Sequence, residues 1–540
     1  MSCSVPQGTH RVSHAGYSGV ATQWGGGRMA GMNPTLCFDA TPEDPATFAA
    51  QCERSASALR ALGVGPGEVV ALMLHNEPVQ VELMLAARTA GAHFCLVNWH
   101  FKAAEVRHVL TDSGARVLIV HAHLVAQIRE GVPPGVQVFA VPPRQRTCDA
   151  FSLGAGPWPE AGAYADWAAF RDAQDRPPVV MGRPGSVMVY TSGTTGLPKG
   201  VRRAAPTPDQ VANMTRTVQV GLGIEPGMRA LVSAPMYHSA PASYVLQAAL
   251  QGGTLWIEPR FEAETTLRLI DEHAITHAYL VPTMYGRLLR LPAEVRSRYR
   301  LTSLRFVAST GSPCPIDVKR AMIDWLGPIF HECYAASELG WITHINSEEA
   351  LACPGSAGRA LPGVTLKVLD AQGDEVPAGT VGLIHARSDA VPDFTYSNNA
   401  QARRELERHG LWTLKDMGYL DADGFLFIVD RQSDMVISGG VNIYPAEIEA
   451  TLVTMPGVAD VAVFGVPAED FGEALLAAVQ PVPGAELTAT QVQAWLRERI
   501  AGYKVPRTVE FHPELPREDT GKIFKRKLRE PHWAGRARRV

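Results

Sequence analysis

A short polar loop that directly follows an apolar run constrains this chain of 540 residues more than any other feature. Residues 187–189 read Val-Met-Val, a pattern typical of a buried strand. Residues 190–200 then hold three glycines, four hydroxyl side chains besides a tyrosine, and one lysine. Glycines let backbone N–H groups approach an anion, hydroxyls donate to its oxygens, and lysine adds positive charge. The pattern predicts a phosphate-binding loop at the end of a buried strand.

Two better-known phosphate loops do not fit these residues. A Walker A loop requires G-x-x-x-x-G-K-[ST], but Gly193 and Gly196 are too close together and Lys199 is followed by Gly200. A dinucleotide-binding turn requires G-x-G-x-x-G, and the loop contains no G-x-G. An ordinary surface loop is disfavoured because such loops rarely place threonine, serine and lysine among glycines after a buried strand.

Helical and apolar strand patterns alternate from about residue 47, which predicts α/β layers. Residues 68–74 and 115–120 are predicted strands, 104–111 a helix, and the proline-rich stretches 133–145 and 154–160 surface loops. Residues 363–430 predict a small β-subdomain, and 431–443 a polar connection. Helix, strand and helix patterns follow at 445–455, 458–466 and 488–500. We therefore place a domain boundary near Ser433, with an N-terminal domain of 1–432 and an α+β domain of 433–540.

Composition excludes several classes of protein. A net charge of -4 leaves no basic footprint for nucleic acid, and no apolar stretch is long enough for a transmembrane helix. The N-terminus lacks the basic and apolar regions of a signal peptide. The eight cysteines are dispersed without a C-x-x-C pair, which favours reduced thiols and a cytoplasmic location. Nothing in the sequence distinguishes a monomer from a homodimer.

The loop resembles the phosphate signature of the adenylate-forming superfamily, which includes acyl-CoA synthetases, luciferases and peptide-synthetase adenylation domains. Further segments resemble that superfamily in the same order along nearly the whole chain. They are residues 235–239 beside the acid pocket, 309–313 at the adenine-binding turn, 334–338 like Y-x-x-T-E, 412–416 with 419–421 at the ribose site, Asp430 and Arg431 before the hinge, 438–445, and Gly521 with Lys522. Seven matches in order are much more specific than any one alone.

The resemblance implies a fold and a set of ligands. The expected fold is a large N-terminal domain of layered α/β subdomains with a small β-barrel-like subdomain, and a small mobile C-terminal lid domain. ATP, Mg²⁺ and coenzyme A are the implied cofactors. The implied nucleotide- and CoA-binding residues are Thr191, Ser192, Gly193, Thr194, Thr195, Lys199, Gly311, Ser312, Tyr334, Asp416, Arg431, Gly439 and Gly440.

Catalytic roles are carried over in the same way. Glu338 would hold Mg²⁺, Ser337 would contact the α-phosphate, and Lys522 would reach the oxygens where charge develops. Alone, Glu338 would be a solvated helix-end carboxylate, Asp416 a turn cap and Lys522 part of a basic tail. His238 would gate the pocket or orient the carboxylate of the acid, or it is simply a packed histidine.

The same resemblance places the acid pocket among Tyr237, His238, Ser239, Tyr244, Ser309, Thr310, Gly311 and Trp341. Residues 236–244 contain no carboxylate that would pair with an α-ammonium, which favours a small-molecule carboxylic acid without one. The local sequence is most similar to fatty- and cyclic-acid CoA ligases. Trp341 either narrows this pocket or packs in the core.

The predicted reaction joins an acid, ATP and CoA into acyl-CoA, AMP and pyrophosphate. An amide ligase that transfers the acyl group to an amine would carry the same ATP motifs, and a non-catalytic binding module would share the fold. Four positions depart from the superfamily pattern: Lys415 beside Asp416, Ser337 where threonine is usual, Ser433 at the hinge, and Trp341 in a stretch that is often small and glycine-rich.

Overall fold

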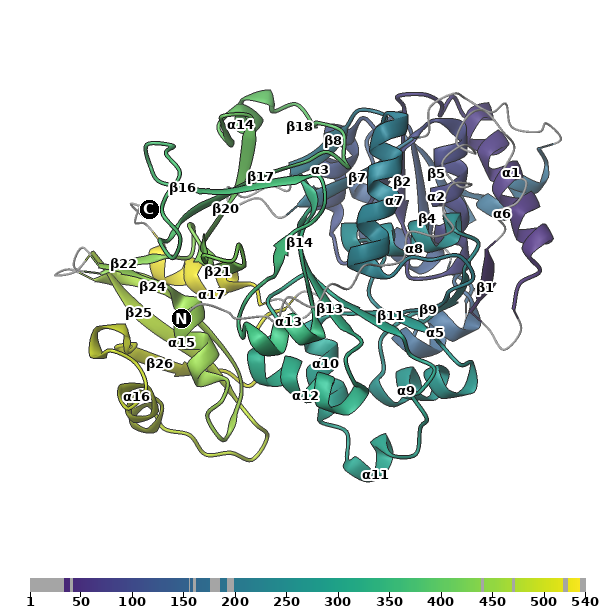
Figure 1. Ribbon diagram of the computed structural model, residues 1–540. Helices are drawn as coiled ribbons and strands as arrows, with labels where there is room; N and C mark the ends of the chain where they lie inside the picture. Colours follow the sequence, from purple (N-terminus) through teal and green to yellow (C-terminus); the bar gives the residue numbers. More distant parts are fainter. Residues whose placement is uncertain are drawn as a thin grey trace, which may run out of the picture.

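The structure is a computed structural model that describes residues 34–38, 42–154, 156–158, 162–174, 185–191, 199–438, 441–468, 472–517 and 523–534. It contains a large N-terminal domain, coloured purple to green in Figure 1, and a smaller C-terminal domain that ends in yellow. The mixed α/β architecture predicted from the alternating patterns is confirmed.

The phosphate loop follows a strand of the first eight-stranded sheet. The sheet is parallel except for β8 near one edge, which pairs antiparallel with both β7 and β18. Its order is β18 (Phe394–Tyr396), β8 (Lys199–Arg203), β7 (Val187–Thr191), β3 (His93–Leu96), β2 (Val69–Met73), β4 (Val117–His121), β5 (Gln137–Val141) and β6 (Ala165–Asp166). Residues 192–198, which lie outside the described residues, therefore fall in sequence between two neighbouring antiparallel strands, β7 and β8.

A second eight-stranded sheet carries the other half of the N-terminal domain. Its order is β1 (Thr35–Cys37), β10 (Thr254–Ile257), β9 (Arg229–Val232), β11 (His277–Leu280), β12 (Phe306–Ser309), β13 (Phe330–Ala336), β14 (Gly340–Asn346) and β15 (Arg359–Ala360). Strands β13 and β14 form a long antiparallel hairpin at the centre of Figure 1. The turn of this hairpin holds residues 337–339.

Helices α2 (Pro78–Ala90) and α8 (Ser239–Leu250) contact each other, and each packs on one of the two sheets. Strand β2 is buried on both faces: Val70 and Leu72 join the core that includes α2 and α8, whereas Val69 and Ala71 face a second core. The remaining helices of this domain are α1 (Pro45–Ala61), α3 (Ala103–Ser113), α4 (Val125–Ile128), α5 (Gln145–Phe151), α6 (Trp167–Asp172), α7 (Pro208–Leu222), α9 (Ala263–Glu272), α10 (Pro282–Leu289), α11 (Ala293–Arg296), α12 (Ile316–Leu326), α13 (Ser347–Ala352) and α14 (Ala400–Arg404).

The predicted β-subdomain is a separate five-stranded sheet beside these layers (Figure 1). It consists of β16 (Val364–Leu369), β17 (Gly382–Ser388), β20 (Leu411–Leu420), β19 (Glu407–Arg408) and β21 (Leu426–Arg431). Strands β20 and β21 are antiparallel and place Asp416 opposite Arg431.

The C-terminal domain has its own sheet and its own apolar core. Its strands are β22 (Val436–Ser438), β23 (Val441–Ile443), β24 (Val458–Ala468), β25 (Gly472–Pro481) and β26 (Thr508–Phe511), and its helices are α15 (Pro445–Leu452), α16 (Ala489–Arg497) and α17 (Lys525–Arg529). Val436, Ile448 and Leu475 belong to this core.

Two segments differ from the sequence-based expectation. The stretch 133–145, predicted as a surface loop, contains β5, which pairs with β4 and buries Phe139. The stretch 431–443, predicted as a polar connection, contains the hairpin strands β22 and β23, because Val436 and Ile443 are buried in the C-terminal core. Tertiary pairing overrides a local composition of proline, glycine and polar residues in both cases.

Seven of the eight cysteines lie among the described residues, and none of these seven forms a disulfide. None of the helices in the described part of the chain is long and apolar enough to span a bilayer.

Candidate active site

Twelve of the predicted site residues line one large cleft of about 3490 Å³. Residues from both sheets of the N-terminal domain, from the β-subdomain and from the C-terminal domain line it. The predicted residues on its surface are Lys199, His238, Ser239, Thr310, Gly311, Ser312, Tyr334, Ser337, Glu338, Trp341, Asp416 and Arg431. The fold thus brings together residues that lie up to 232 positions apart in the chain.

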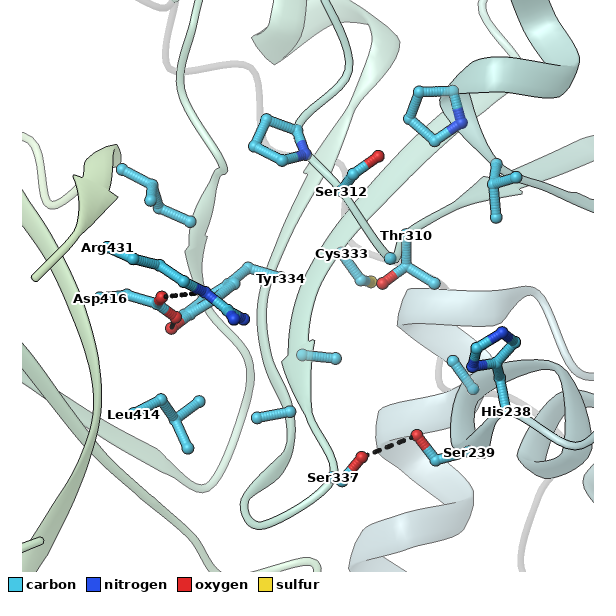
Figure 2. Close-up of a pocket in the computed structure, with 18 of the residues that line it drawn as sticks. His238, Ser239, Thr310, Ser312, Cys333, Tyr334, Ser337, Leu414, Asp416 and Arg431 are labelled. Atoms are coloured by element: carbon cyan, nitrogen blue, oxygen red, sulfur yellow. Dashed lines mark hydrogen bonds and ion pairs between the residues drawn. The ribbon is translucent and has the colours of Figure 1, made fainter. Parts of the chain in front are cut away.

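Asp416 forms one wall of the cleft together with Tyr334 and Arg431 (Figure 2). The Tyr334 hydroxyl donates to Asp416 Oδ2 at 2.5 Å, and Arg431 Nε lies 3.2 Å from Asp416 Oδ1. Burial and the neighbouring Asp416 raise the pKa of Tyr334 well above its ordinary value, so its hydroxyl stays a donor. An anchored carboxylate beside an aromatic ring suits a ligand that carries vicinal hydroxyls and a flat base.

The hairpin turn after β13 presents Ser337 and Glu338 to the cleft. Glu338 Oε1 accepts a hydrogen bond of 2.9 Å from the Tyr396 hydroxyl. Lys199 Nζ lies 5.5 Å from the centroid of the Tyr396 ring, so Tyr396 contacts both the lysine and the carboxylate. Because Glu338 is nearly buried, its charge faces few water molecules and many protein dipoles.

The backbone of this turn is held from a third strand. Arg203 of β8 donates from Nη2 to the carbonyl oxygen of Ser337. Burial lowers the pKa of Arg203 to about 10, and the nearby Glu338 and Asp393 carboxylates oppose that shift. The guanidinium therefore remains charged near neutral pH and adds a positive charge beside Glu338.

The N-terminus of α8 forms the opposite side of the cleft. His238 is the N-cap residue and caps no backbone N–H group with its side chain. Ser239 Oγ lies 3.0 Å from Ser337 Oγ across the cleft (Figure 2). Gly311 follows β12 with φ at 95°, a conformation that favours glycine, and so lets the chain turn sharply beside Thr310. The indole of Trp341 is only 5% exposed.

Three residues predicted for the acid pocket lie behind the cleft wall, not on it. Tyr237, Tyr244 and Ser309 are at most 4% exposed and are absent from the cleft lining. The Tyr237 ring packs edge-on against Trp99, and Tyr244 packs against Tyr279 on the core side of α8. For Tyr244, helical periodicity explains why the side chain is not on the cleft: Ser239 and Tyr244 belong to one helix but face different directions.

Several predicted residues lie outside the described residues: Ser192, Gly193, Thr194, Thr195, Gly439, Gly440 and Lys522. Thr191 is described through its backbone alone, as the last residue of β7, where it pairs with Lys199.

Sequence reasoning missed Arg203 and Tyr396. Arg203 lies four residues after Lys199 on the strand that follows the phosphate loop, and a basic residue there was a usable signal. Tyr396 lies 58 residues from Glu338 in sequence, and no local pattern relates the two.

The structure thus places Asp416, Tyr334, Arg431, Lys199 and Glu338 in one cleft of a two-domain α/β fold. The family model described as AMP-binding enzyme matches residues 46–392, and the model of the AMP-binding enzyme C-terminal domain matches residues 447–522. The chain belongs to this family of AMP-binding enzymes. The resemblance to the adenylate-forming superfamily is thereby confirmed.

Relatives agree with this assignment over most of the chain. Feruloyl-CoA synthase from an Amycolatopsis species is 35% identical, covering 88% of this chain and 91% of the relative. Indoleacetate–CoA ligase from Aromatoleum aromaticum is 32% identical, covering 93% and 96%. The crystal structure of ATP-bound MatB from Rhodopseudomonas palustris superposes with a TM-score of 0.78 at 27% identity, covering 93% of this chain and 96% of that chain. The predicted class, an AMP-forming ligase, agrees with these relatives.

Proposed function

We propose that this protein is an acyl-CoA ligase that activates a carboxylic acid with ATP as an acyl-adenylate and transfers the acyl group to coenzyme A, releasing AMP and pyrophosphate. The observation that carries the proposal is the single cleft in which Asp416 and Tyr334 lie on one wall and the Ser337–Glu338 turn on the next. The similarity to CoA ligases supports CoA as the acceptor.

For the nucleotide, we assign the ribose hydroxyls to Asp416 and a further donor to Arg431. Tyr334 stacks on adenine next to Gly311 and Ser312, and the loop from Thr191 to Lys199 holds the β- and γ-phosphates. Ser337 donates to the α-phosphate. Lys522 neutralises the oxygens on which charge develops, so the acid and the phosphate approach each other without uncompensated repulsion.

The donor set suits Mg²⁺ when nucleotide phosphates complete it. Glu338 provides a hard carboxylate oxygen, and Tyr396 orients that carboxylate. Among the described residues, no group of three or more acidic, histidine or cysteine side chains is placed to hold a metal by itself. Mg²⁺ bound to Glu338 and phosphate oxygens would neutralise the polyphosphate.

For the acid, we propose a carboxylic acid that is largely apolar and carries no charge besides its carboxylate. Aromatic acids are the first to test. The residues of α7 and α8 that line the cleft are Gln210, Val211, Met214, Thr215, Ser239, Ala240, Pro241, Ala242, Ser243, Leu246 and Gln247. None of them is charged, so none would pair with an α-ammonium group. The names of the two CoA ligases described above specify aromatic acids, which agrees with this environment.

For the second half-reaction, we propose that residues 433–540 act as a lid that carries Lys522 and that Gly439 and Gly440 let the CoA arm approach closely. The described cysteines, none of which forms a disulfide, support a cytoplasmic location for the enzyme.

The test is acid-dependent exchange of labelled pyrophosphate into ATP across a panel of aromatic, fatty and cyclic acids, followed by product analysis with CoA or with amines. We expect exchange with at least one acid and a CoA thioester as product. An amide formed in preference to a thioester would replace the ligase assignment by the amide ligase, and absence of exchange with every acid would contradict adenylation itself.

A further inference from the structure

Ser337 and Ser239 form a hydroxyl pair that the motifs do not explain. Ser337 begins the turn of the β13–β14 hairpin, and Ser239 is the first residue of α8. Their Oγ atoms lie 3.0 Å apart, and Figure 2 shows both side chains pointing toward each other in the cleft. The two residues are separated by 98 positions in the chain, so only the tertiary fold creates the contact.

A serine at position 337 needs such a contact more than a threonine would. The proposed function requires residue 337 to donate a hydrogen bond to the α-phosphate, and related motifs carry threonine there. The branched Cβ of threonine restricts its χ1 torsion, whereas serine populates three staggered positions. A serine in this role therefore benefits from a neighbour that selects one of them.

Ser239 is placed to make that selection. It belongs to a 12-residue helix whose other face is fixed in the core by residues such as Val245 and Ala248. Arg203 already holds the backbone carbonyl of Ser337, so the torsion of the side chain is the main remaining freedom. A hydroxyl has one donor and two lone pairs, and when Ser239 donates to Ser337 Oγ, the proton of Ser337 is free for a phosphate oxygen.

We propose that Ser239 is a positioning residue for adenylation, acting through the hydroxyl of Ser337. This inference rests on the proposed function, since it assigns Ser337 to the α-phosphate. Its distinctive consequence is that threonine at position 337 makes the hydroxyl at position 239 dispensable.

The experiment compares four proteins in acid-dependent pyrophosphate exchange: the wild type, Ser239→Ala, Ser337→Thr and the double variant. Loss of one rotamer restraint and of a positioned donor should lower kcat of Ser239→Ala by about three- to tenfold, with little change in KM for the acid. Ser337→Thr should remain active, and Ser239→Ala in that background should cost less than about twofold. Ser239→Cys, which keeps the volume but is a weak donor, should repeat the loss seen with alanine.

Ser297→Ala is the control for a serine-to-alanine change, because Ser297 Oγ donates to Glu294 O on the exposed helix α11. An equal loss from Ser239→Ala in both backgrounds, or a change confined to KM for the acid, would overturn the inference and leave Ser239 as a wall of the acid pocket. A wild type that exchanges with no acid would overturn the proposed function, and this inference with it.

Discussion

Asp416 is held by partners at both of its carboxylate oxygens. It is 6% exposed, yet both of its oxygens have partners, the Tyr334 hydroxyl and the Arg431 guanidinium. A carboxylate held in this way does not need to reorganise when a polar ligand arrives, which is the property expected of a binding group.

We predict that Asp416→Asn weakens ATP binding. A hydrogen bond to a charged group contributes about 1.5–3 kcal/mol, so KM for ATP should rise about 10- to 100-fold. Steady-state kinetics with varied ATP measures the change. Asp370→Asn is the matched control, because Asp370 Oδ1 only caps a turn of the same subdomain, through the backbone N–H groups of Gln372, Gly373 and Asp374. An unchanged KM for Asp416→Asn would contradict the ribose role.

Tyr396→Phe should weaken the response to Mg²⁺. The change removes the 2.9 Å hydrogen bond that orients Glu338, and loss of such a partner typically lowers metal affinity about 10- to 100-fold. Titration of exchange activity with Mg²⁺ measures the half-saturating concentration.

Tyr299→Phe removes a chemically identical hydrogen bond of the same 2.9 Å, to Glu264, outside the cleft. If both variants gave the same Mg²⁺ curve as the wild type, Glu338 would not be the metal ligand.

At the scale of residues, Lys199, Glu338 and Asp416 could be predicted because each lies in a short motif that resembles one of the superfamily. The acid pocket was less predictable. The resemblance to the superfamily assigned Tyr244 to it, but the helix directs the tyrosine into the core. Arg203 and Tyr396 reach the turn from other strands, and only the sheet order brings them there.

At the scale of secondary-structure elements, the buried acid Glu258 follows strand β10 and links it to β9 and α9. Glu258 Oε2 accepts hydrogen bonds from Ser233, which follows β9, and from Thr266 of α9. Its other oxygen has no hydrogen-bond partner among the described residues, and the side chain is 1% exposed. Burial raises the pKa of Glu258 to about 7.

This raised pKa predicts a pH-dependent stability. The folded protein binds the Glu258 proton more tightly than the unfolded chain, so the stabilisation is complete below pH ~4.5 and is lost as the pH rises to about 7, by up to about 3 kcal/mol. Glu258→Gln should remove this component of the slope. Urea midpoints measured between pH 5 and 8 test the prediction.

Glu262→Gln is the contrasting control. Glu262 caps α9 through the backbone N–H groups of Glu264 and Thr265, and the net effect of its surroundings lowers its pKa. Its contribution to stability is therefore present above its ordinary pKa and lost only in acid. A slope between pH 5 and 8 that Glu258→Gln left intact would show that another group titrates there.

Elements with a strong period or a long apolar run were predicted well, including β2 at Val69–Met73, β4 at Val117–His121 and α15 at Pro445–Leu452. Strand β5 was missed because prolines flank a run of only a few apolar residues, and its stability comes from pairing with β4. The β22–β23 hairpin was missed for the same physical reason, since its three pairs are stabilised by burial of Val436 against the C-terminal core.

At the scale of the whole molecule, α15 of the C-terminal domain contacts β21 of the β-subdomain and also pairs with α17 of its own domain. Lys525 Nζ lies 2.8 Å from Glu449 Oε1, and Asp430 of β21 accepts a hydrogen bond of 3.0 Å from the backbone N–H of Ala446. Glu449 Oε1 also accepts from Val463 N at 2.6 Å, which ties α15 to β24. The last strand of the β-subdomain is thereby joined directly to the first helix of the C-terminal domain.

We predict that the Lys525–Glu449 pair contributes a measurable coupling to stability. In a double-mutant cycle with Lys525→Met and Glu449→Gln, the coupling should be about 1–2 kcal/mol, because both side chains are less than one-fifth exposed. Urea unfolding of the four proteins gives the value.

The matched control is the Lys504–Glu447 pair, in which Lys504 Nζ lies 2.6 Å from Glu447 Oε2. Glu447 lies on α15, as Glu449 does, but it is 44% exposed. Solvent screening should limit its coupling to about 0–1 kcal/mol. Equal couplings for the two pairs would mean that burial of Lys525 and Glu449 does not strengthen their ion pair.

The sequence by itself indicated the family and the order of the nucleotide motifs, through resemblance to known motifs, and it indicated the α/β class and the two-domain organisation through hydrophobic period. Only the tertiary structure decided which side chains face the cleft, that Tyr396 orients Glu338, and that Ser239 meets Ser337. The physical reason is that each of these contacts joins separate elements far apart in the chain. Sheet order and helix packing, rather than any local pattern, set the distance between them.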